Sequence, residues 1–265
     1  VMDETPAMED KGTSELRITR GDIVFQNVYF KYQPEAAEYI LSDINLDIKG
    51  GQTIGIVGGT GSAKSSLVQL IPRLYDISAG SLTVDGRDIK EYSLAHLRDA
   101  VGMVLQTNTL FSGTIRENLL WGNPQANDDE IAWACHVACV DDFLGKLPKG
   151  LDTVLGQGGA GVSGGQRQRI CIARTLLQRP KVLILDVSTS AVDTATEARI
   201  RNGLAQGLPN TTRIIISQRV LSVQDADQII VLDNGHIKAV GTHKHLLAAH
   251  EIYRDMYNAQ QKGVA

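Results

Sequence analysis

The stretch that decides the fold is Gly58-Gly59-Thr60-Gly61-Ser62-Ala63-Lys64-Ser65-Ser66. An apolar, β-branched segment over 53–57 precedes this run, and the pattern after it predicts a short helix over 65–71. In such a strand–loop–helix setting, backbone N–H groups and the helix N-terminus point at phosphate groups. Lys64 would place a positive charge near the terminal phosphates, and the Ser65 hydroxyl would ligate Mg²⁺. The run therefore predicts that the chain binds a nucleoside triphosphate.

One position in this run departs from the phosphate-loop template. Ala63 stands where the template has glycine. The alternative to a nucleotide site is an ordinary turn, because small residues are common ahead of helices. Loop, lysine and hydroxyl all occur in the context that the template requires, so the nucleotide site is the favoured interpretation.

The composition is that of a globular protein, with 43% hydrophobic and 21% charged residues among 265. This length can bury one large core, or one domain plus a subdomain. With 26 basic and 30 acidic residues, the chain has no bulk attraction to nucleic acid, which is not expected as a partner. No apolar run approaches the roughly 18 residues of a transmembrane helix, and no signal peptide is recognisable. Because the chain begins at Val1 rather than methionine, we expect it to be a segment of a longer protein.

The three cysteines do not form a disulfide framework, and reduced thiols point to the cytoplasm. Cys135 and Cys139 are expected to share one face of a helix over 127–147, with His136 close by. Two thiols and one histidine make a poor zinc site without a fourth ligand. A small apolar helix face is therefore the favoured interpretation, and no metal is assigned there.

The rest of the chain alternates apolar runs with helical patterns. Residues 1–20 are polar and are expected to form a linker, and three short runs over 23–25, 28–32 and 40–48 predict antiparallel strands. Alternating strands and helices further along indicate an α/β fold with a parallel sheet. The further elements expected are helices over 127–147 and 166–177 and strands over 101–105, 182–186, 213–216 and 228–232.

Three further groups suit the chemistry of a bound triphosphate. Val162-Ser163-Gly164-Gly165-Gln166 comes just before a helix, where a serine hydroxyl and tightly turned N–H groups could receive a phosphate. Asp186 ends a strand and could hold a Mg²⁺-bound water. Gln106 follows another strand and could reach the metal or an attacking water.

Together with the phosphate loop, these groups resemble the nucleotide-binding domain of ABC transporters, and the resemblance covers nearly the whole chain. It implies a P-loop NTPase (RecA-like) fold over 21–265: a parallel-sheet core, an antiparallel β subdomain, and an α-helical subdomain at about 107–165. It also implies ATP and Mg²⁺ as cofactors. Four matching residues alone would be weak evidence, whereas all the motifs in the family's order are strong evidence.

The resemblance assigns a role to each matching position. Tyr32 looks like the aromatic residue that stacks on adenine, and the glycine-rich run looks like Walker A. Gln106 looks like the Q-loop glutamine that faces the membrane domain, and 162–166 looks like the signature, with Val162 in place of leucine. The strand over 182–186 looks like Walker B. Ser190-Ala191-Val192-Asp193 looks like the D-loop.

From these positions we assign the binding and catalytic sets. Ser65, Gln106 and Asp186 are expected to hold the metal, and Lys64, Gln106, Asp186 and Gln218 to act in catalysis. In this family two such domains stack head to tail, so that each ATP lies between one domain's Walker motifs and the other domain's signature. A second nucleotide-binding domain is therefore an expected partner.

The segments over 109–118, 241–243 and 1–6 resemble those of exporters. This likeness predicts the C-terminal half of an exporter subunit, at the cytoplasmic face of the membrane, with its transmembrane domain missing from the chain.

Two departures from the family pattern bear on catalysis. Val187 stands where the family has a glutamate that activates water, and Gln218 stands where it has a histidine. Losing a positioned general base costs on the order of 10²–10⁴ in rate. Because the signature is intact, we expect a chain whose own site hydrolyses ATP poorly and whose signature completes a competent site on a different subunit. The alternatives are a homodimer, a clamp in which ATP acts without hydrolysis, and a soluble ABC ATPase of translation or DNA repair.

Overall fold

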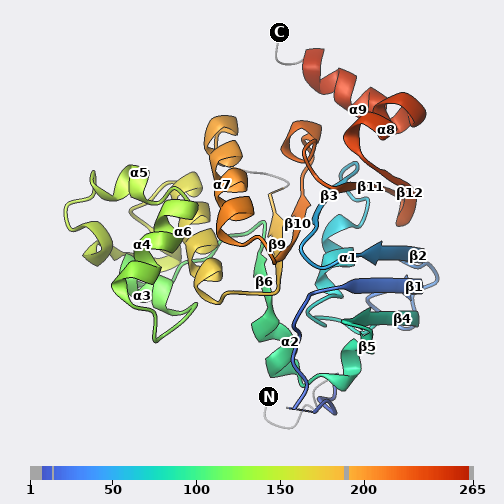
Figure 1. Cartoon of the computed structure of the whole chain (residues 1–265), viewed down its shortest axis with the longest axis horizontal. Helices are drawn as coiled ribbons and strands as arrows, with labels where there is room; N and C mark the ends of the chain where they lie inside the picture. The colour runs from blue at the N-terminus through green and yellow to red at the C-terminus, as the bar shows by residue number, and fades with distance from the viewer. Residues whose placement is uncertain (1–7, 14, 188–190, 263–265) are drawn as a thin grey trace.

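A six-stranded sheet forms the centre of the computed structural model, which describes residues 8–13, 15–187 and 191–262 (Figure 1). Its strand order is β12-β11-β3-β10-β9-β6, and neighbouring strands run parallel except for the antiparallel pair β11 and β12. The strands are β3 (Thr53–Val57), β6 (Val101–Val104), β9 (Val182–Asp186), β10 (Thr212–Ile216), β11 (Gln228–Asp233) and β12 (His236–Gly241). The predicted α/β class with a parallel sheet is confirmed.

A second, antiparallel sheet has the order β2-β1-β4-β5. The prediction of two separate strands over 23–25 and 28–32 is wrong, because one strand, β1, runs through both. Asn27, with φ 48°, lies inside this strand, and the pairing register shifts between Phe25 and Val28. The strands are β1 (Ile23–Phe30), β2 (Leu41–Ile48), β4 (Ala79–Val84) and β5 (Arg87–Asp88).

The hydrophobic core lies on both faces of the central sheet, because side chains alternate along each strand. In β9, Val182 and Ile184 belong to a cluster shared with the small sheet and α1 (Lys64–Gln69). Leu183 and Leu185 belong to a second cluster shared with the helices on the other face. Figure 1 shows α3 to α6 on one side of the central sheet and the small sheet on the other.

The prediction of a single helix over 127–147 is wrong. The chain leaves α4 after Val137, and Cys139 takes a left-handed conformation with φ 55°. Arg169 donates a hydrogen bond of 2.9 Å to the Cys139 carbonyl, which satisfies an acceptor at the break. Cys135 and Cys139 therefore do not share a helical face, although both are buried, and burial raises the pKa of Cys135 to about 12.

The helices around the second cluster are α3 (Ile115–Leu120), α4 (Asp128–Val137), α5 (Asp141–Leu144), α6 (Gly164–Leu177) and α7 (Thr194–Gly207). Helices α8 (His243–Ala249) and α9 (Glu251–Lys262) also contribute to this cluster, through Leu246 and Tyr253. Helix α2 (Leu94–Ala100) contributes Leu97 to the first cluster. The short elements are η1 (Ile89–Glu91), β7 (Gly113–Thr114), η2 (Gly150–Asp152), β8 (Val154–Leu155), η3 (Gln157–Gly159) and η4 (Val220–Ser222). Within the described ranges, every helix is too short or too polar to cross a bilayer.

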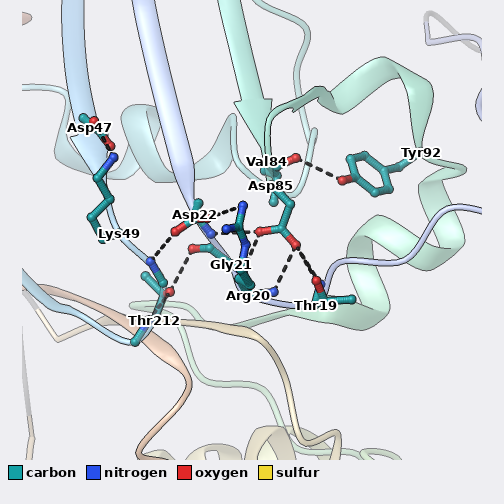
Figure 2. A network of polar contacts seen from close by, with 12 residues as sticks. Thr19, Arg20, Gly21, Asp22, Asp47, Lys49, Val84, Asp85, Tyr92 and Thr212 are labelled. Carbon is teal, nitrogen blue, oxygen red and sulfur yellow. Dashed lines mark hydrogen bonds and ion pairs between the residues drawn. The ribbon is translucent and has the colours of Figure 1, made fainter.

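The chain enters β1 through a turn that one carboxylate organises (Figure 2). Asp85 accepts hydrogen bonds from the backbone N–H groups of Thr19, Arg20, Gly21 and Asp22, at 2.7, 3.0, 2.8 and 3.0 Å. Burial alone would raise the pKa of Asp85, but these donors favour the charged form and lower the pKa below its ordinary value. The end of the polar N-terminal segment is thereby fixed against the turn that joins β4 and β5.

Candidate functional site

The phosphate loop connects β3 to α1 and closes around its own lysine. Lys64 Nζ donates hydrogen bonds to the carbonyls of Gly58 and Gly59, at 2.9 and 2.7 Å, and to Ser62 Oγ at 3.1 Å. Burial lowers the pKa of Lys64, and the nearby charge of Asp186 partly opposes this. The result is an amino group held inside the turn by two backbone carbonyls and one hydroxyl, within the loop that is expected to bind phosphate.

The serine and the aspartate expected to hold Mg²⁺ are in direct contact. Ser65 Oγ, at the start of α1, donates a 2.6 Å hydrogen bond to Asp186 Oδ2, at the end of β9. Asp186 is almost fully buried. A hydroxyl and a carboxylate are oxygen ligands of the kind that Mg²⁺ takes beside substrate phosphates. The donor set therefore fits the expected metal.

A cavity of about 390 Å³ opens over the loop, within the range of small-molecule sites. It brings together Tyr32, the loop over 60–66, Gln106 and Gln218, which are far apart in the sequence. Ile40 also lines it and was not predicted as a site residue, because an apolar residue ahead of a strand carries no signal of a binding role. The cavity thus gathers most of the predicted nucleotide-binding residues.

Tyr32 stands at the edge of this cavity with half of its surface exposed. Its hydroxyl lies 2.8 Å from Ser66 Oγ, and its ring meets those of Phe30 and Tyr75 edge-on, with centroids 4.8 and 4.9 Å apart. The ring is therefore held at its rim and hydroxyl, in a place where an adenine could contact it.

Ala63 occupies the position at which the sequence departs from the template. It lies at the N-cap of α1 with φ 70°, a left-handed conformation that glycine adopts without strain and alanine does not. No side chain caps this helix end. The first N–H groups of α1 thus donate no hydrogen bond to a capping side chain at residue 63.

Val187, at the position where the family pattern predicts a general base, is not among the residues that line this cavity. Its N–H donates to the Ile216 carbonyl at 3.0 Å, which extends the β9–β10 ladder by one residue beyond Asp186. Since side chains alternate along a strand, Val187 lies on the face opposite Asp186, in the cluster that contains Val192 and Ile215. Among the described residues that line the cavity, none carries a carboxylate.

The signature residues lie outside this cavity, at the start of α6. Ser163 Oγ accepts from the Gln166 N–H at 3.2 Å, and Gln166 Oε1 accepts from the Ser163 N–H at 2.9 Å, which forms a capping box. Ser163 and Gly164 are exposed, and Val162 packs partly against the core. A Cβ atom at Gly165 would come within 2.7 Å of the Ala191 carbonyl, so glycine is required for this close approach.

The described part of the predicted D-loop precedes α7 and contacts α6; Ser190 lies outside the described residues. The Ala191 N–H donates to Gln168 Oε1 at 3.3 Å, and Val192 is buried. Asp193 caps α7 by accepting from the Thr196 N–H at 2.9 Å, and this hydrogen bond lowers the pKa of Asp193. Gln168, a buried polar residue of α6, was not predicted to have a role here.

A second residue that the sequence did not reveal contacts the segment after β10. Gln260, near the end of α9, donates from Nε2 to the Gln218 carbonyl at 2.7 Å, and its Oε1 accepts from the Val220 N–H at 2.8 Å. Nothing in the sequence pattern pairs positions this far apart.

Comparison with known proteins gives concordant results. The family model described as ABC transporter matches residues 41–190, more than half of the chain. Putative multidrug export ATP-binding/permease proteins of Staphylococcus aureus, strains NCTC 8325 and Mu50, are each 42% identical over 249 residues. The match covers 94% of this chain and 43% of each relative, so the chain spans less than half the length of these relatives.

The fold is similar to that of a solved bacterial Atm1-family ABC exporter with ATP bound. The TM-score is 0.87 at 36% sequence identity, over 92% of this chain and 42% of that one. This likeness confirms the predicted fold class, because it extends over nearly the whole chain.

Proposed function

The chain belongs to the ABC transporter family, and from this premise we propose that it is the ATP-binding domain of an exporter subunit with a slow site of its own. That site would bind Mg-ATP through its Walker motifs and hydrolyse it poorly. Its signature would complete a competent site on a second, different nucleotide-binding domain.

The observation that carries the nucleotide site is the contact between Ser65 and Asp186, 2.6 Å apart beside the buried Lys64. Lys64 would bind the terminal phosphates, and Ser65 and Asp186 would hold Mg²⁺ directly or through water. Mg²⁺, when bound, would supply the charge that neutralises the phosphates. Gln106, which lines the same cavity, would orient a water or ligate the metal.

The proposal of slow hydrolysis rests on Val187 and Gln218. Val187 has no proton-accepting atom and faces the apolar cluster rather than the cavity. Gln218 lines the cavity and could donate an amide hydrogen bond to the terminal phosphate, but it carries no charge. A missing base lowers the rate on the order of 10²–10⁴, so the site would hold ATP far longer than a competent one.

The proposal of a different partner rests on the signature surface. Ser163 and Gly164 are exposed and lie outside the chain's own cavity, so they would act on a nucleotide held by another domain. A partner with an intact glutamate and histidine would make one competent site and one slow site. A homodimer, or a clamp that never hydrolyses ATP, would instead show no turnover when the chain is mixed with such a partner.

Docking to a transmembrane domain, at the cytoplasmic face of a membrane, is supported by an aromatic surface beyond β6. Leu105, Phe111 and Trp121 are exposed, and the rings of Phe111 and Trp121 lie 4.8 Å apart. Leu105 and Phe111 line a hollow of about 170 Å³ next to Gln106. An exposed apolar patch of this kind is typical of an interaction surface, and the Staphylococcus aureus relatives are named as combined ATP-binding and permease proteins.

The test is a pair of measurements on the chain. Saturating Mg-ATP should raise its melting temperature, because a ligand at 100 times its Kd stabilises the native state by about 2.7 kcal/mol. Turnover by the chain alone should stay far below the ~10 s⁻¹ of a typical enzyme. Lys64→Ala is the control and should abolish most of the thermal shift. Absence of a shift in the unmodified chain, or turnover near the typical value, would contradict the proposal.

A further inference from the structure

The last helix, α9, packs through one stripe of its surface. Tyr253, Met256, Tyr257 and Gln260 follow the i, i+3, i+4, i+7 spacing of one helix face, and all four are buried or half-buried. The Tyr253 hydroxyl lies 2.7 Å from Nδ1 of His243 in α8, and burial raises the pKa of Tyr253 to about 12. The first turns of α9 are thus fixed beside α8 (Figure 1).

The end of this stripe lies against the segment that follows β10. The side-chain amide of Gln260 donates to the Gln218 carbonyl at 2.7 Å and accepts from the Val220 N–H at 2.8 Å. One planar amide therefore binds the backbone on both sides of Arg219. This pair of contacts restrains the loop more than either would alone, because it fixes the separation of the two backbone groups as well as their distance from α9.

We propose that Gln260 is a positioning residue for the nucleotide site: it holds the Gln218 backbone so that the Gln218 side chain meets the terminal phosphate of ATP. The inference rests on the proposed function of Gln218 as a donor to that phosphate. Gln218 lines the cavity, and Gln260 binds its backbone carbonyl rather than its side chain, so this contact does not occupy the side-chain amide. Without the contact, the loop would have to be ordered at the moment of binding, at an entropic cost.

The position of Gln218 matters only for a nucleotide that has a γ-phosphate to contact, which ATP has and ADP lacks. Loss of the Gln260 contacts should therefore weaken ATP and leave ADP unchanged. A residue that merely stabilises α9 would lower the melting temperature and affect both nucleotides alike. The ratio of the two affinities separates positioning from general stability.

The experiment measures the Kd of Mg-ATP and of Mg-ADP, together with the melting temperature, for the whole chain and its variants. Gln260→Met keeps a side chain of similar length and removes both hydrogen bonds. We expect Mg-ATP to bind about threefold to tenfold more weakly, as for loss of one neutral hydrogen bond, with Mg-ADP unchanged. Gln261→Met, at the exposed neighbouring position, is the matched control and should change neither Kd. Gln260→Glu provides a second variant, since its carboxylate keeps the acceptor for Val220 but repels the Gln218 carbonyl.

Gln218→Ala and the double variant Gln218→Ala/Gln260→Met complete a double-mutant cycle. This cycle separates the proposed role of Gln218 from the positioning role of Gln260. If Gln260 acts through Gln218, the double variant binds Mg-ATP no more weakly than Gln218→Ala alone. If Gln218→Ala leaves the ATP-to-ADP ratio unchanged, the proposed role of Gln218 fails, and the inference fails with it. If Gln218→Ala changes the ratio but Gln260→Met and Gln260→Glu do not, the role of Gln218 stands and the positioning role of Gln260 is wrong. Equal weakening of both nucleotides by the Gln260 variants would also overturn the inference.

Discussion

Two helices of this domain, α1 and α6, begin after glycine-containing turns. The two turns differ in their N-cap residues and in their surroundings. At α1 the N-cap is Ala63, which offers no side-chain hydrogen bond, and the turn lies in a cavity with the buried Lys64. At α6 the N-cap is Ser163, whose hydroxyl already accepts from the Gln166 N–H, and the turn is exposed. The first turn has a lysine and the predicted metal ligands beside it within one chain, whereas among the described residues around the second turn none was predicted to ligate a metal.

A glycine-rich turn before a helix therefore does not by itself define a complete binding site. What surrounds the turn decides whether the chain can bind an anion by itself. For α1 the required groups come from β9, β10 and the segment after β6. For α6 the structure describes a capping box and the contact between Ala191 and Gln168, which fits the proposal that a nucleotide there is held by another domain.

The largest expected effect that tests this comparison is at the exposed turn. Ser163→Arg should lower steady-state ATP turnover of the assembled transporter on the order of 10²–10³-fold, as when one donor aimed at developing charge is removed. The arginine would also fill the surface that a partner's phosphates must reach. Gln125→Arg, which adds the same charge at an exposed position of the helical region, is the control and should leave turnover near normal.

Lys64→Ala tests the other turn. Hydrogen bonds to charged groups contribute about 1.5–3 kcal/mol each, so the Kd for Mg-ATP in the chain's own site should rise at least about tenfold. Turnover of the assembled transporter should fall only partially, because the competent site uses the partner's lysine. If Lys64→Ala were as damaging as Ser163→Arg in the same assay, the two sites would be equivalent and the asymmetric arrangement wrong.

Asp85→Ala provides a reference that lies in neither turn. Removing the acceptor of four backbone N–H groups should lower the free energy of unfolding by about 1–3 kcal/mol, measured with denaturant, while leaving the Kd for Mg-ATP unchanged. Asp47→Ala is the matched control, since that exposed carboxylate pairs with Lys49 and such pairs contribute about 0–1 kcal/mol.

The effect of Asp85 should also depend on pH. Because the folded-state pKa is lower than the unfolded one, the stabilisation is fully present above the unfolded value of about 3.9. It is lost as the pH falls through the lower folded-state pKa. The gap between the unmodified protein and Asp85→Ala should therefore narrow in acid; a gap that widens as the pH falls would contradict the assignment.

Val187→Glu tests whether a carboxylate at position 187 can act as the general base at the proposed slow site. The new side chain would start on the face of β9 opposite Asp186, so we expect less than about tenfold recovery of turnover at the slow site, out of the 10²–10⁴ that a positioned base supplies. Gln218→His and the double variant should be compared with it, because residues that act together are not additive. Full recovery by Val187→Glu alone would mean that position 187 can reach the cavity and that Gln218 matters little.

Ala63→Gly has the smallest expected effect and tests whether the left-handed conformation of Ala63 strains the α1 turn. Relief of the left-handed conformation should outweigh the greater freedom of glycine in the unfolded chain, for a net gain of about 0.5–1 kcal/mol in unfolding free energy. Ala126→Gly, at a position without a positive φ, is the control and should not stabilise the protein. A loss of stability at both positions would show that Ala63 is not strained.

Much of this site could be predicted because its elements are short apolar runs with clear ends. The apolar run over 182–186 predicts a strand with the same bounds as β9, and the motif pattern assigns Ser65 and Asp186, which are in contact, to one metal. Parallel strands place their carboxyl ends at one edge of a sheet, so residues after different strands converge there. The spacing of apolar residues and the residues that end each run are therefore sufficient to predict the central sheet.

The features that could not be predicted depend on contacts between residues far apart in the sequence, which a local pattern does not show. The break at Cys139 has no glycine or proline to mark it, and it is stabilised by Arg169 from α6. Gln260 acts on a loop some forty positions earlier in the chain, at the end of a helix that was not predicted. The direction of Val187 follows from one backbone hydrogen bond to Ile216, which lies on a neighbouring strand.

The buried place of Val187 has a consequence for the history of such a domain. Valine fits the apolar cluster, whereas a glutamate that entered the same space would be a carboxylate taken out of water, which is costly unless it is paired. A chain that has exchanged glutamate for valine and repacked around it would have to give up stability before it could regain a base. The packing around Val187 thus favours keeping the valine once it is present.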